Sequence, residues 1–281
     1  MNFLLALQWL HFAANGLAAF RVGGLGIAAS LSLIHVNAAL QARSHSGAML
    51  STTDPIAHFG ACLVPGGLDR SLVMQLSAAS RMLSLHREEM ARVDETCDQL
   101  VFLHQGATKL VAHASHDREQ IVAFHFADDL VSVPAKTSHE YCLVALRATT
   151  LLTFSYDKVI ELSAEHPAIL RALLEASRTS LGRCREKSIA LGRKSAPERV
   201  ASFLVALSRR TAVEDGDKLL LPLPMSRRDI ADSMGITIET VSRQLTILRE
   251  RNVIESLGRS QIRILDLPAL EGNAGFLSAA H

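Results

Sequence analysis

The sequence has few cysteines, and none of them form the close pairs that mark a zinc ribbon or an iron–sulfur cluster. The four are Cys62, Cys97, Cys142 and Cys184, each more than thirty residues from the next. This spacing gives no C-x-x-C pair and does not resemble the disulfide framework of a small secreted protein. We therefore expect reduced thiols, a cytoplasmic protein, and no metal or other cofactor.

Signatures of catalysis and a strong overall charge are also absent. The chain contains no Ser-His-Asp nucleophile elbow, no phosphate loop of the form G-x-x-x-x-G-K-[ST] and no H-E-x-x-H. We therefore do not expect an enzyme. The net charge is only +1, which gives no general attraction to nucleic acid. Any recognition of nucleic acid would therefore depend on where individual charged residues lie.

Acidic residues are missing from the first 46 positions, which are apolar and carry only two arginines. The stretch Phe3–Ile34 has the length of a signal or membrane segment, but polar residues and glycines interrupt it. An ordinary polar start follows at Met49. We expect residues 1–48 to be extraneous or disordered, with translation starting at Met49. A membrane-anchored protein is the alternative.

Short apolar segments separated by polar turns run from about Arg81 to Ser155. Expected strands lie at Gln99–Leu103 and Ile121–Phe124, with a turn at His113–Arg118. A later strand pair is expected at Tyr141–Leu146 and Leu151–Ser155. Many short strands at close spacing favour a small barrel or roll. We expect residues 49–165 to form this domain.

A long helix is expected next, over residues 166–194. Pro167 suits a first helical turn, and the next proline is Pro197. Two rows of residues with seven-residue spacing lie on one stripe, which is the geometry of a helix that pairs with a partner helix. The expected dimer seam is Leu170, Leu174, Leu181, Cys184 and Leu191, with Ser177 and Ser188 between them. A helix that lies on its own roll is the alternative.

Residues 195–281 are expected to form the third domain. A helix from Ala196 places Val200, Phe203, Leu204 and Leu207 on one face, and Leu219–Pro222 reads as a short strand.

Two short helices joined by a tight turn are expected within this third domain. Ser226 is a capping residue for the first, Gly235 supplies the left-handed conformation of the turn, and Thr237 caps the second. Small Ala231 allows a close helix crossing. The expected core between the helices is Ile230, Met234, Ile236, Val241 and Leu245. This pattern indicates a helix-turn-helix between about Arg227 and Val253.

Side chains early in the second helix are suited to reading DNA bases. Glu239 and Arg243 are four residues apart and share a face. A glutamate accepts from cytosine, and an arginine grips guanine O6 and N7. Ser242 can hydrogen-bond to several bases, and Ile238 can touch a thymine methyl group. The alternative is a surface pair between Glu239 and Arg243.

Candidate phosphate contacts are Ser226, Arg227, Thr237, Arg249 and Arg251. Each of the arginines could equally be a solvated surface charge. Ile262–Leu265 is expected to be a strand of a small wing behind the motif.

These residues resemble the CRP/FNR superfamily of transcription regulators. The stretches Leu223–Asp232 and Gly235–Arg243 look like its FixK-type branch, and Glu239, Ser242 and Arg243 match the Glu-x-x-Ser-Arg reading signature of fumarate–nitrate-type regulators. The resemblance implies half-sites like TTGAT in an inverted repeat. The implied fold is α+β: an N-terminal β-roll (a cyclic-nucleotide-binding-like jelly roll), a long dimerisation helix and a C-terminal winged helix-turn-helix.

The sensor region departs from this family's pattern. The clustered N-terminal cysteines of the iron–sulfur members are missing, so we expect no such cluster. The region Asp128–His139 offers Lys136-Thr137-Ser138 and no arginine, which is a poor phosphate site for a cyclic nucleotide. Asp128 and Ser132 stand where glycine is usual, whereas Gly106 fits the pattern.

Histidines and a seam cysteine leave an effector open. His113 and His116 are three apart, and His104 and His125 lie on neighbouring expected strands. A haem or metal site is one interpretation, and solvent-facing or packed side chains are the other. Cys184, between two arginines, is either a redox-sensitive thiol or a small packed one.

We therefore expect a homodimeric transcription activator that binds double-stranded DNA at a TTGAT-N4-ATCAA-like palindrome and contacts RNA polymerase. The family resemblance places its targets in microaerobic respiration, denitrification or nitrogen fixation. The alternative is a divergent β-roll protein that senses haem, redox state or a small molecule.

Overall fold

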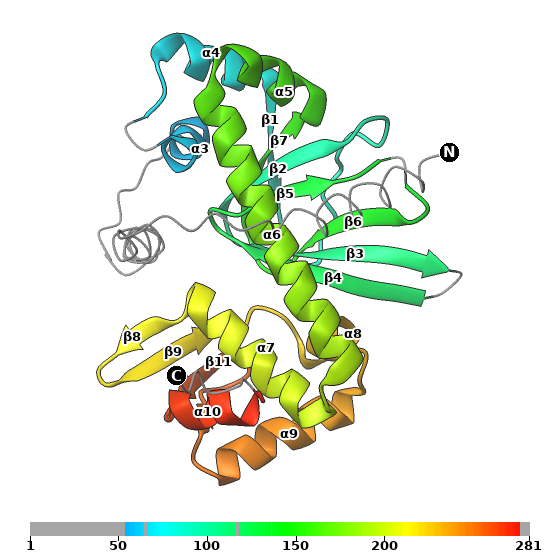
Figure 1. Cartoon of the computed structure of the whole chain (residues 1–281), viewed down its shortest axis with the longest axis vertical. Helices are drawn as coiled ribbons and strands as arrows, with labels where there is room; N and C mark the ends of the chain where they lie inside the picture. Colours follow the sequence, from blue (N-terminus) through cyan, green and yellow to red (C-terminus); the bar gives the residue numbers. More distant parts are fainter. Residues whose placement is uncertain (1–53, 65–66, 116–117, 136, 276–281) are drawn as a thin grey trace, which may run out of the picture. The chain divides into compact units, whose positions relative to one another are not determined.

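The computed structural model of the chain describes residues 54–64, 67–115, 118–135 and 137–275 (Figure 1). The expectations for residues 1–48, including the membrane alternative, fall outside these residues, as do His116 and Lys136. Among the described helices, none has the length and apolar character needed to span a membrane.

Two short helices, α3 (Pro55–Leu63) and α4 (Arg70–Ala79), precede the first strand. The Asp54 side chain caps α3 by accepting from the backbone N–H of Ile56 at 3.0 Å, and Pro55 occupies the first turn. Asp69 caps α4 by accepting from the N–H of Leu72 at 2.9 Å. Sequence analysis assigned this region to the roll without separate helices, although the Asp-Pro start of α3 is a local helix signal.

Seven strands form the expected roll as two antiparallel sheets, with strand orders β1-β7-β2-β5 and β4-β3-β6. Their bounds are β1 Ser80–Leu85, β2 Gln99–Gln105, β3 Ala107–Ser115, β4 Arg118–Phe126, β5 Leu130–Val133, β6 Glu140–Ala145 and β7 Thr149–Ser155. The expected turn at His113–Arg118 is shorter than predicted: the backbone stays paired as far as Ser115 and pairs again from Arg118. The hairpin of β3 and β4 is longer than expected because backbone pairing between the two strands continues through the polar residues that were assigned to the turn.

Both faces of β2 are buried, which explains its unbroken apolar run. Val101 and Leu103 face the core between the two sheets, which includes Leu143 and Leu151. Leu100 and Phe102 belong to a second core together with residues of α3, α4 and α6. A strand covered on two sides needs apolar residues at every position rather than at alternate ones.

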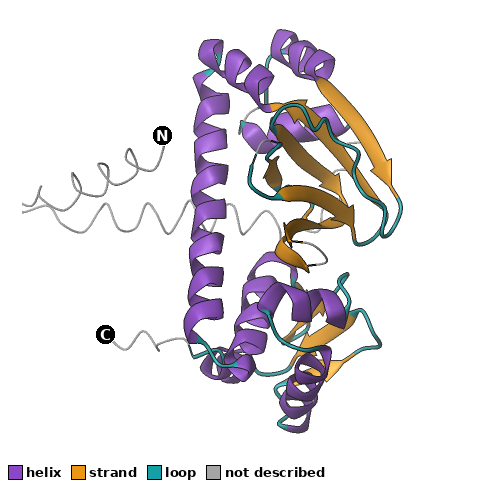
Figure 2. Ribbon diagram, turned by 90° about the vertical axis from the view of Figure 1, so that its right-hand side faces the viewer, coloured by secondary structure: helices purple, strands orange, loops and turns teal. Residues whose placement is uncertain are grey.

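The helix α5 (Tyr156–Glu165) leads to the long helix α6 (Pro167–Arg193), with a break at His166 before the proline. Ile169 and Leu173 of α6 are buried in the core beneath α3 and α4. Figure 2 shows α6 as one uninterrupted helix beside the strands of the roll.

The C-terminal part combines four helices with a small sheet. Its elements are α7 Ala196–Thr211, β8 Val213–Asp215, β9 Lys218–Pro222, α8 Arg227–Met234, α9 Ile238–Glu250, β10 Ile254–Ser256, β11 Gln261–Ile264 and α10 Leu267–Asn273. The sheet order is β10-β11-β9-β8. The predicted strands at Leu219–Pro222 and Ile262–Leu265 correspond to β9 and β11. On α7, Val200, Leu204 and Leu207 are buried as expected, and Phe203 packs edge-on against Phe124 of the roll.

Candidate nucleic-acid interface

The first helix of the motif, α8, is fixed at both ends by its own sequence. The Ser226 hydroxyl accepts from the Asp229 N–H at 3.1 Å, and the Asp229 carboxylate accepts from the Ser226 backbone N–H at 2.8 Å. This reciprocal capping satisfies two backbone donors that helix starts leave open. At the other end Gly235 has φ +63°, the left-handed conformation that glycine adopts without steric cost. α8 therefore starts and stops where predicted.

The second helix, α9, begins at a threonine cap and packs across the first. The Thr237 side chain accepts from the N–H of Thr240 at 3.2 Å. Ala231 is 1% exposed at the crossing, which leaves room for close contact between the helices. The predicted core residues Ile230, Met234, Val241 and Leu245 are buried, and Ile236 is partly buried. The two helices thus form a rigid unit whose other face is open.

The predicted base-reading residues lie on that open face. Glu239 and Arg243 are exposed, one turn apart on α9, while Ser242 and Ile238 are half-buried. Ile238 also packs against the core of the domain, so only part of its side chain faces outward. Among the ion pairs of the described residues there is none between Glu239 and Arg243, contrary to the alternative of a simple surface pair.

The carboxylate of Glu239 is suited to act as an acceptor. Its own backbone N–H, and then the Thr237 hydroxyl, lower the pKa of Glu239 below its ordinary value. The group is therefore ionised at neutral pH and can accept from a base amino group.

All five predicted phosphate-contact residues are exposed: Ser226, Arg227, Thr237, Arg249 and Arg251. They differ in what else they bind. The hydroxyls of Ser226 and Thr237 serve as helix caps, and Arg251 lies 3.5 Å from the Asn273 side-chain oxygen. Sequence analysis missed Arg259, which is exposed beside Gly258 in the turn between β10 and β11. In the sequence, Arg259 is marked only by its place after a glycine between two short apolar segments.

The predicted seam residues form an apolar stripe on α6. Leu170, Leu174 and Leu181 are 51%, 70% and 50% exposed, Cys184 is exposed and Leu191 is half-buried. The hydroxyls of the two interleaved serines donate to carbonyls of the same helix, from Ser177 to Leu173 and from Ser188 to Cys184. Because these hydroxyls already have partners, the stripe can pack against an apolar surface.

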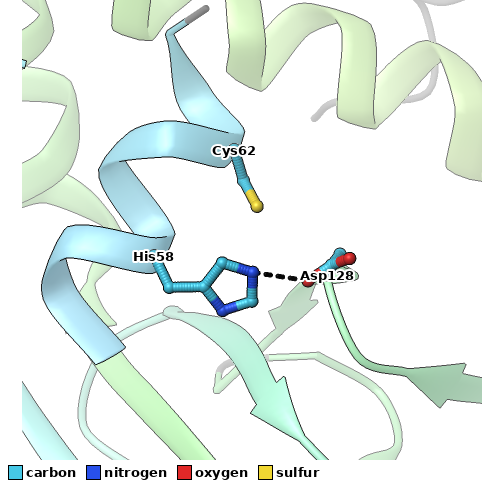
Figure 3. Close-up of side chains that lie close together, drawn as sticks. All are labelled: His58, Cys62 and Asp128. Carbon is cyan, nitrogen blue, oxygen red and sulfur yellow. Dashed lines mark ion pairs between the residues drawn. The ribbon is translucent and has the colours of Figure 1, made fainter. Parts of the chain in front are cut away.

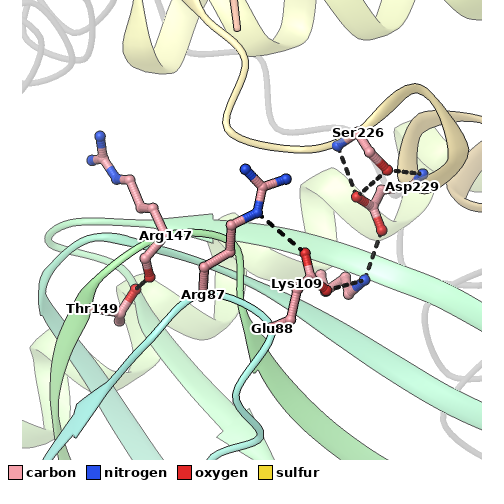
Figure 4. A network of polar contacts seen from close by, with 7 residues as sticks. All are labelled: Arg87, Glu88, Lys109, Arg147, Thr149, Ser226 and Asp229. Atoms are coloured by element: carbon pink, nitrogen blue, oxygen red, sulfur yellow. Dashed lines mark hydrogen bonds and ion pairs between the residues drawn. The ribbon is translucent and has the colours of Figure 1, made fainter. Parts of the chain in front are cut away.

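A network that sequence analysis did not anticipate joins the roll to α8 (Figure 4). The Lys109 ammonium of β3 lies 2.7 Å from the Asp229 carboxylate and 3.6 Å from that of Glu88. Nearby, the Gln120 side chain of β4 donates to the Asp232 carbonyl at 2.7 Å. Burial opposes the charge on Asp229, but hydrogen bonds from Lys109 and Ser226 hold the pKa of Asp229 below its ordinary value. The same carboxylate thus caps the helix and binds the roll.

The candidate effector residues do not gather in one place. Of the histidines, His104 contacts His58, His113 lies 3.6 Å from the Cys142 sulfur, and His125 is buried near Asp129. Gly106 has φ +104°, and a Cβ there would lie 2.6 Å from the Thr149 backbone, so glycine is required. Asp128 has φ +71°, the conformation expected of the glycine that it replaces.

Comparison with known proteins identifies the fold and the family. Residues 198–272 match the family described as Crp-like helix-turn-helix domain. The chain is 36% identical over 173 residues to the nitrogen fixation regulation protein FixK of Rhizobium meliloti, an alignment covering 62% of this chain and 77% of FixK. It is 30% identical over 192 residues to the transcriptional activator protein FnrA of Stutzerimonas stutzeri, covering 66% of this chain and 78% of FnrA.

Solved structures agree with this assignment. The structure of FixK2 from Bradyrhizobium japonicum superposes with a TM-score of 0.63 at 28% identity, covering 71% of this chain and 99% of FixK2. A CooA variant from Carboxydothermus hydrogenoformans, at 20% identity and a TM-score of 0.61, shares the fold. With its β-roll, long helix and C-terminal helix-turn-helix, the chain belongs to the CRP/FNR family of DNA-binding transcription regulators, in its FixK-type branch.

Proposed function

We propose that the chain binds a palindromic DNA site as a homodimer, reads it with Glu239, Ser242 and Arg243, and activates transcription by contacting RNA polymerase. The observation that carries the proposal is the exposed pair Glu239 and Arg243 in the first turns of α9. In helix-turn-helix proteins the N-terminal residues of the second helix contact base edges in the major groove.

The expected half-site is TTGAT, repeated in the inverted arrangement TTGAT-N4-ATCAA. Arg243 is assigned to the guanine, whose O6 and N7 accept two hydrogen bonds from a guanidinium group. Glu239 is assigned to a cytosine amino group and Ser242 to a neighbouring base, with a smaller contact from Ile238 to a thymine methyl. Arg227, Arg249 and Arg251 bind phosphates, as do the start of α8 at Ser226 and the start of α9 at Thr237.

Dimerisation through α6 supplies the two-fold symmetry that a palindrome requires. The support is the exposed stripe of Leu170, Leu174 and Leu181, continued by Cys184 and Leu191. In this proposal residues 49–165 are the sensor roll, 166–194 the dimerisation helix and 195–281 the DNA-binding domain.

We further infer a cytoplasmic regulator of microaerobic respiration, denitrification or nitrogen-fixation genes. The support is the similarity to two regulators, the nitrogen fixation regulation protein FixK and the transcriptional activator protein FnrA. Transcription from a promoter carrying the palindrome, with purified RNA polymerase, measures the activating contact directly.

The experiment for DNA recognition is a titration of the purified chain against TTGAT-N4-ATCAA duplex, a duplex in which each half-site guanine pair is replaced, and a scrambled duplex, all at one stated salt concentration. We expect selective binding of the first duplex and its loss on replacing the guanine pairs. Equal, weak binding of all three duplexes would contradict the proposed site.

A further inference from the structure

A group of metal-ligating side chains lies at one edge of the roll, away from the DNA-binding helices. His58 and Cys62 come from α3, and Asp128 comes from the turn between β4 and β5. One ligand atom from each of the three lies within 4.8 Å of the other two. Figure 3 shows the Cys62 sulfur and the His58 ring directed toward the Asp128 carboxylate. Sequence analysis missed the group because its members are far apart in the chain.

Core packing holds the two helix residues in place. Phe59 is fully buried, with its ring 5.1 Å from Phe102 and 4.8 Å from Phe154. This anchor fixes the rotation of α3, and residues four apart share one helix face. His58 and Cys62 are therefore presented together at the roll's edge, with the His58 ring packed edge-on against Phe102.

A second histidine orients the first. The Nδ1 atoms of His58 and His104 are 2.8 Å apart, so one of them donates and the other accepts. A donor Nδ1–H on His58 leaves the lone pair of its Nε2 pointing outward. Metal-bound histidines commonly donate their other ring nitrogen to such a partner.

The outward nitrogen faces a carboxylate. His58 Nε2 lies 3.0 Å from Asp128 Oδ1. With the proton on Nδ1, the Nε2 lone pair and the Asp128 carboxylate oxygen can both bind one cation, which then replaces the proton that these two atoms share in the metal-free ion pair. In tetrahedral zinc sites, bond lengths of roughly 2.0–2.3 Å place neighbouring ligand atoms about 3.3–3.6 Å apart. The three side chains therefore need only a small adjustment to close on one ion.

We propose that His58, Cys62 and Asp128 bind a divalent transition-metal ion, with water as the fourth ligand. One imidazole, one thiolate and one carboxylate form a mixed N, S, O set that suits Zn²⁺ in four-coordinate geometry. Asp128 is 62% exposed, so the site is open to solvent and to exchange of the ion.

The backbone conformation of Asp128 allows a substitution that should not disturb the fold. Its φ of +71° is a conformation that glycine adopts freely and an aspartate adopts at some cost. Asp128→Gly therefore removes the carboxylate and relaxes the turn at the same time. We therefore expect Asp128→Gly to stay folded, which a thermal melt measures separately from metal binding.

The experiment titrates the chelator-treated full chain with Co²⁺ and follows its absorption spectrum. We expect a thiolate-to-cobalt charge-transfer band and tetrahedral d–d bands, both abolished by adding Zn²⁺. In Cys62→Ser the charge-transfer band should disappear. In Asp128→Gly, cobalt affinity should fall at least tenfold. In His104→Leu, which removes the hydrogen-bonding partner of His58 Nδ1, it should fall by roughly 10–100-fold.

The chain offers a matched control in its other His–Cys pair, His113 and Cys142, whose Nε2 and Sγ atoms are 3.6 Å apart. His113→Gln in that pair, and Cys184→Ser at an exposed cysteine of α6, should leave the cobalt spectrum unchanged. A charge-transfer band that persists in Cys62→Ser, or that disappears in His113→Gln, would overturn the assignment, as would a wild-type spectrum without the band. The spectrum does not depend on DNA, so this result is independent of the proposed DNA recognition.

Discussion

Arg243 is the side chain in which base recognition can be tested most directly. Its guanidinium is exposed on α9 and is assigned to a guanine of each half-site. We expect Arg243→Ala to cost about 1–3 kcal/mol of binding free energy per half-site and to relax selectivity at that base pair. The measurement compares the affinities of wild type and variant for the palindrome and for duplexes changed at the guanine. Unchanged selectivity in the variant would remove Arg243 from base reading.

Arg251 provides the contrasting case at the same scale. It lies at the end of α9 and is assigned to a phosphate. Arg251→Ala is expected to weaken binding to every duplex by a similar factor and to lower the slope of log affinity against log salt by about 1. Affinities at several salt concentrations, for the palindrome and a scrambled duplex, measure both quantities. A selective loss on the palindrome alone would instead mean that Arg251 reads sequence.

His125 makes folding stability depend on pH. The residue is 7% exposed, and its Nδ1 lies 3.8 Å from Asp129, beyond hydrogen-bonding distance. Burial lowers the pKa of His125 to about 4; Asp129 opposes this shift, and Arg210 and Arg183 add to it. Between this value and the ordinary 6.5, the unfolded chain binds more protons than the folded one. Stability is therefore fully present above pH 6.5 and falls as the pH falls toward 4.

The pH effect is isolated by comparing variants. We expect the free energy of unfolding of the wild type to fall from pH 7 to pH 5 by about 2 kcal/mol more than that of His125→Phe. Denaturant unfolding at the two pH values measures it. The exposed His139 is the matched control, and His139→Phe should behave like the wild type. Equal pH dependence in the wild type and His125→Phe would show that His125 is not the group responsible.

Among the helices and strands, the most accurate predictions from the sequence were the boundaries that neighbouring residues determine. The helices α8 and α9 begin and end at Ser226, Gly235 and Thr237 because caps and a left-handed turn act within a few residues. The long α6 was predicted from Pro167 and from the seven-residue spacing along it. The predicted pairing of the strands Tyr141–Leu146 and Leu151–Ser155 is wrong, because β6 pairs with β3 while β7 pairs with β1 and β2 in the other sheet. The helix α3 was missed although Asp54 caps it locally, because no hydrophobic periodicity stands out in so short a segment.

The proposed dimer interface on α6 can be tested by introducing one charged side chain into the apolar stripe and the same side chain at a control position. Leu174 is 70% exposed in the single chain and belongs to the apolar stripe. Leu174→Glu is expected to dissociate the dimer, because two buried carboxylates would repel, while the subunit keeps its fold. Thr179 is also exposed but lies on the opposite face of the heptad, so Thr179→Glu should remain dimeric. Sedimentation measures the oligomeric state. A dimer that survives Leu174→Glu would place the interface elsewhere.

At the scale of the whole molecule, contacts between distant segments escaped sequence analysis. Lys109 and Asp229 are 120 residues apart, and their pairing requires the roll and α8 to be in place. The Lys187 ammonium of α6 similarly donates to the Ile121 and Val122 carbonyls of β4, and burial lowers the pKa of Lys187 to about 8. No local pattern encodes such partners. The proposed metal site was missed for the same reason, since His58 and Asp128 meet only when α3 packs on the roll.

The contact between Lys109 and Asp229 should make the stability of the DNA-binding helices depend on the roll. The two side chains are 15% and 7% exposed, so the pair is nearly dry. Breaking a buried pair costs about 3–5 kcal/mol because one charge is left uncompensated. In Lys109→Met, Asp229 still accepts hydrogen bonds from Ser226, so its charge is partly compensated. We therefore expect the free energy of unfolding to fall by about 2–3 kcal/mol, at or below the lower end of that range.

The loss should be confined to one part of the molecule. In Lys109→Met, amide hydrogens of α8 should exchange faster while those of β2 and β7 keep their protection, since the roll's own core is unchanged. The control is Lys158→Met on α5, whose pair with Glu161 is about two-thirds exposed and contributes about 0–1 kcal/mol. Exchange measured by mass spectrometry resolves the three elements. Uniform loss of protection across the roll and the helices would mean that Lys109 stabilises the roll itself. Unchanged exchange in α8 would show that the contact between Lys109 and Asp229 does not hold the DNA-binding helices in place.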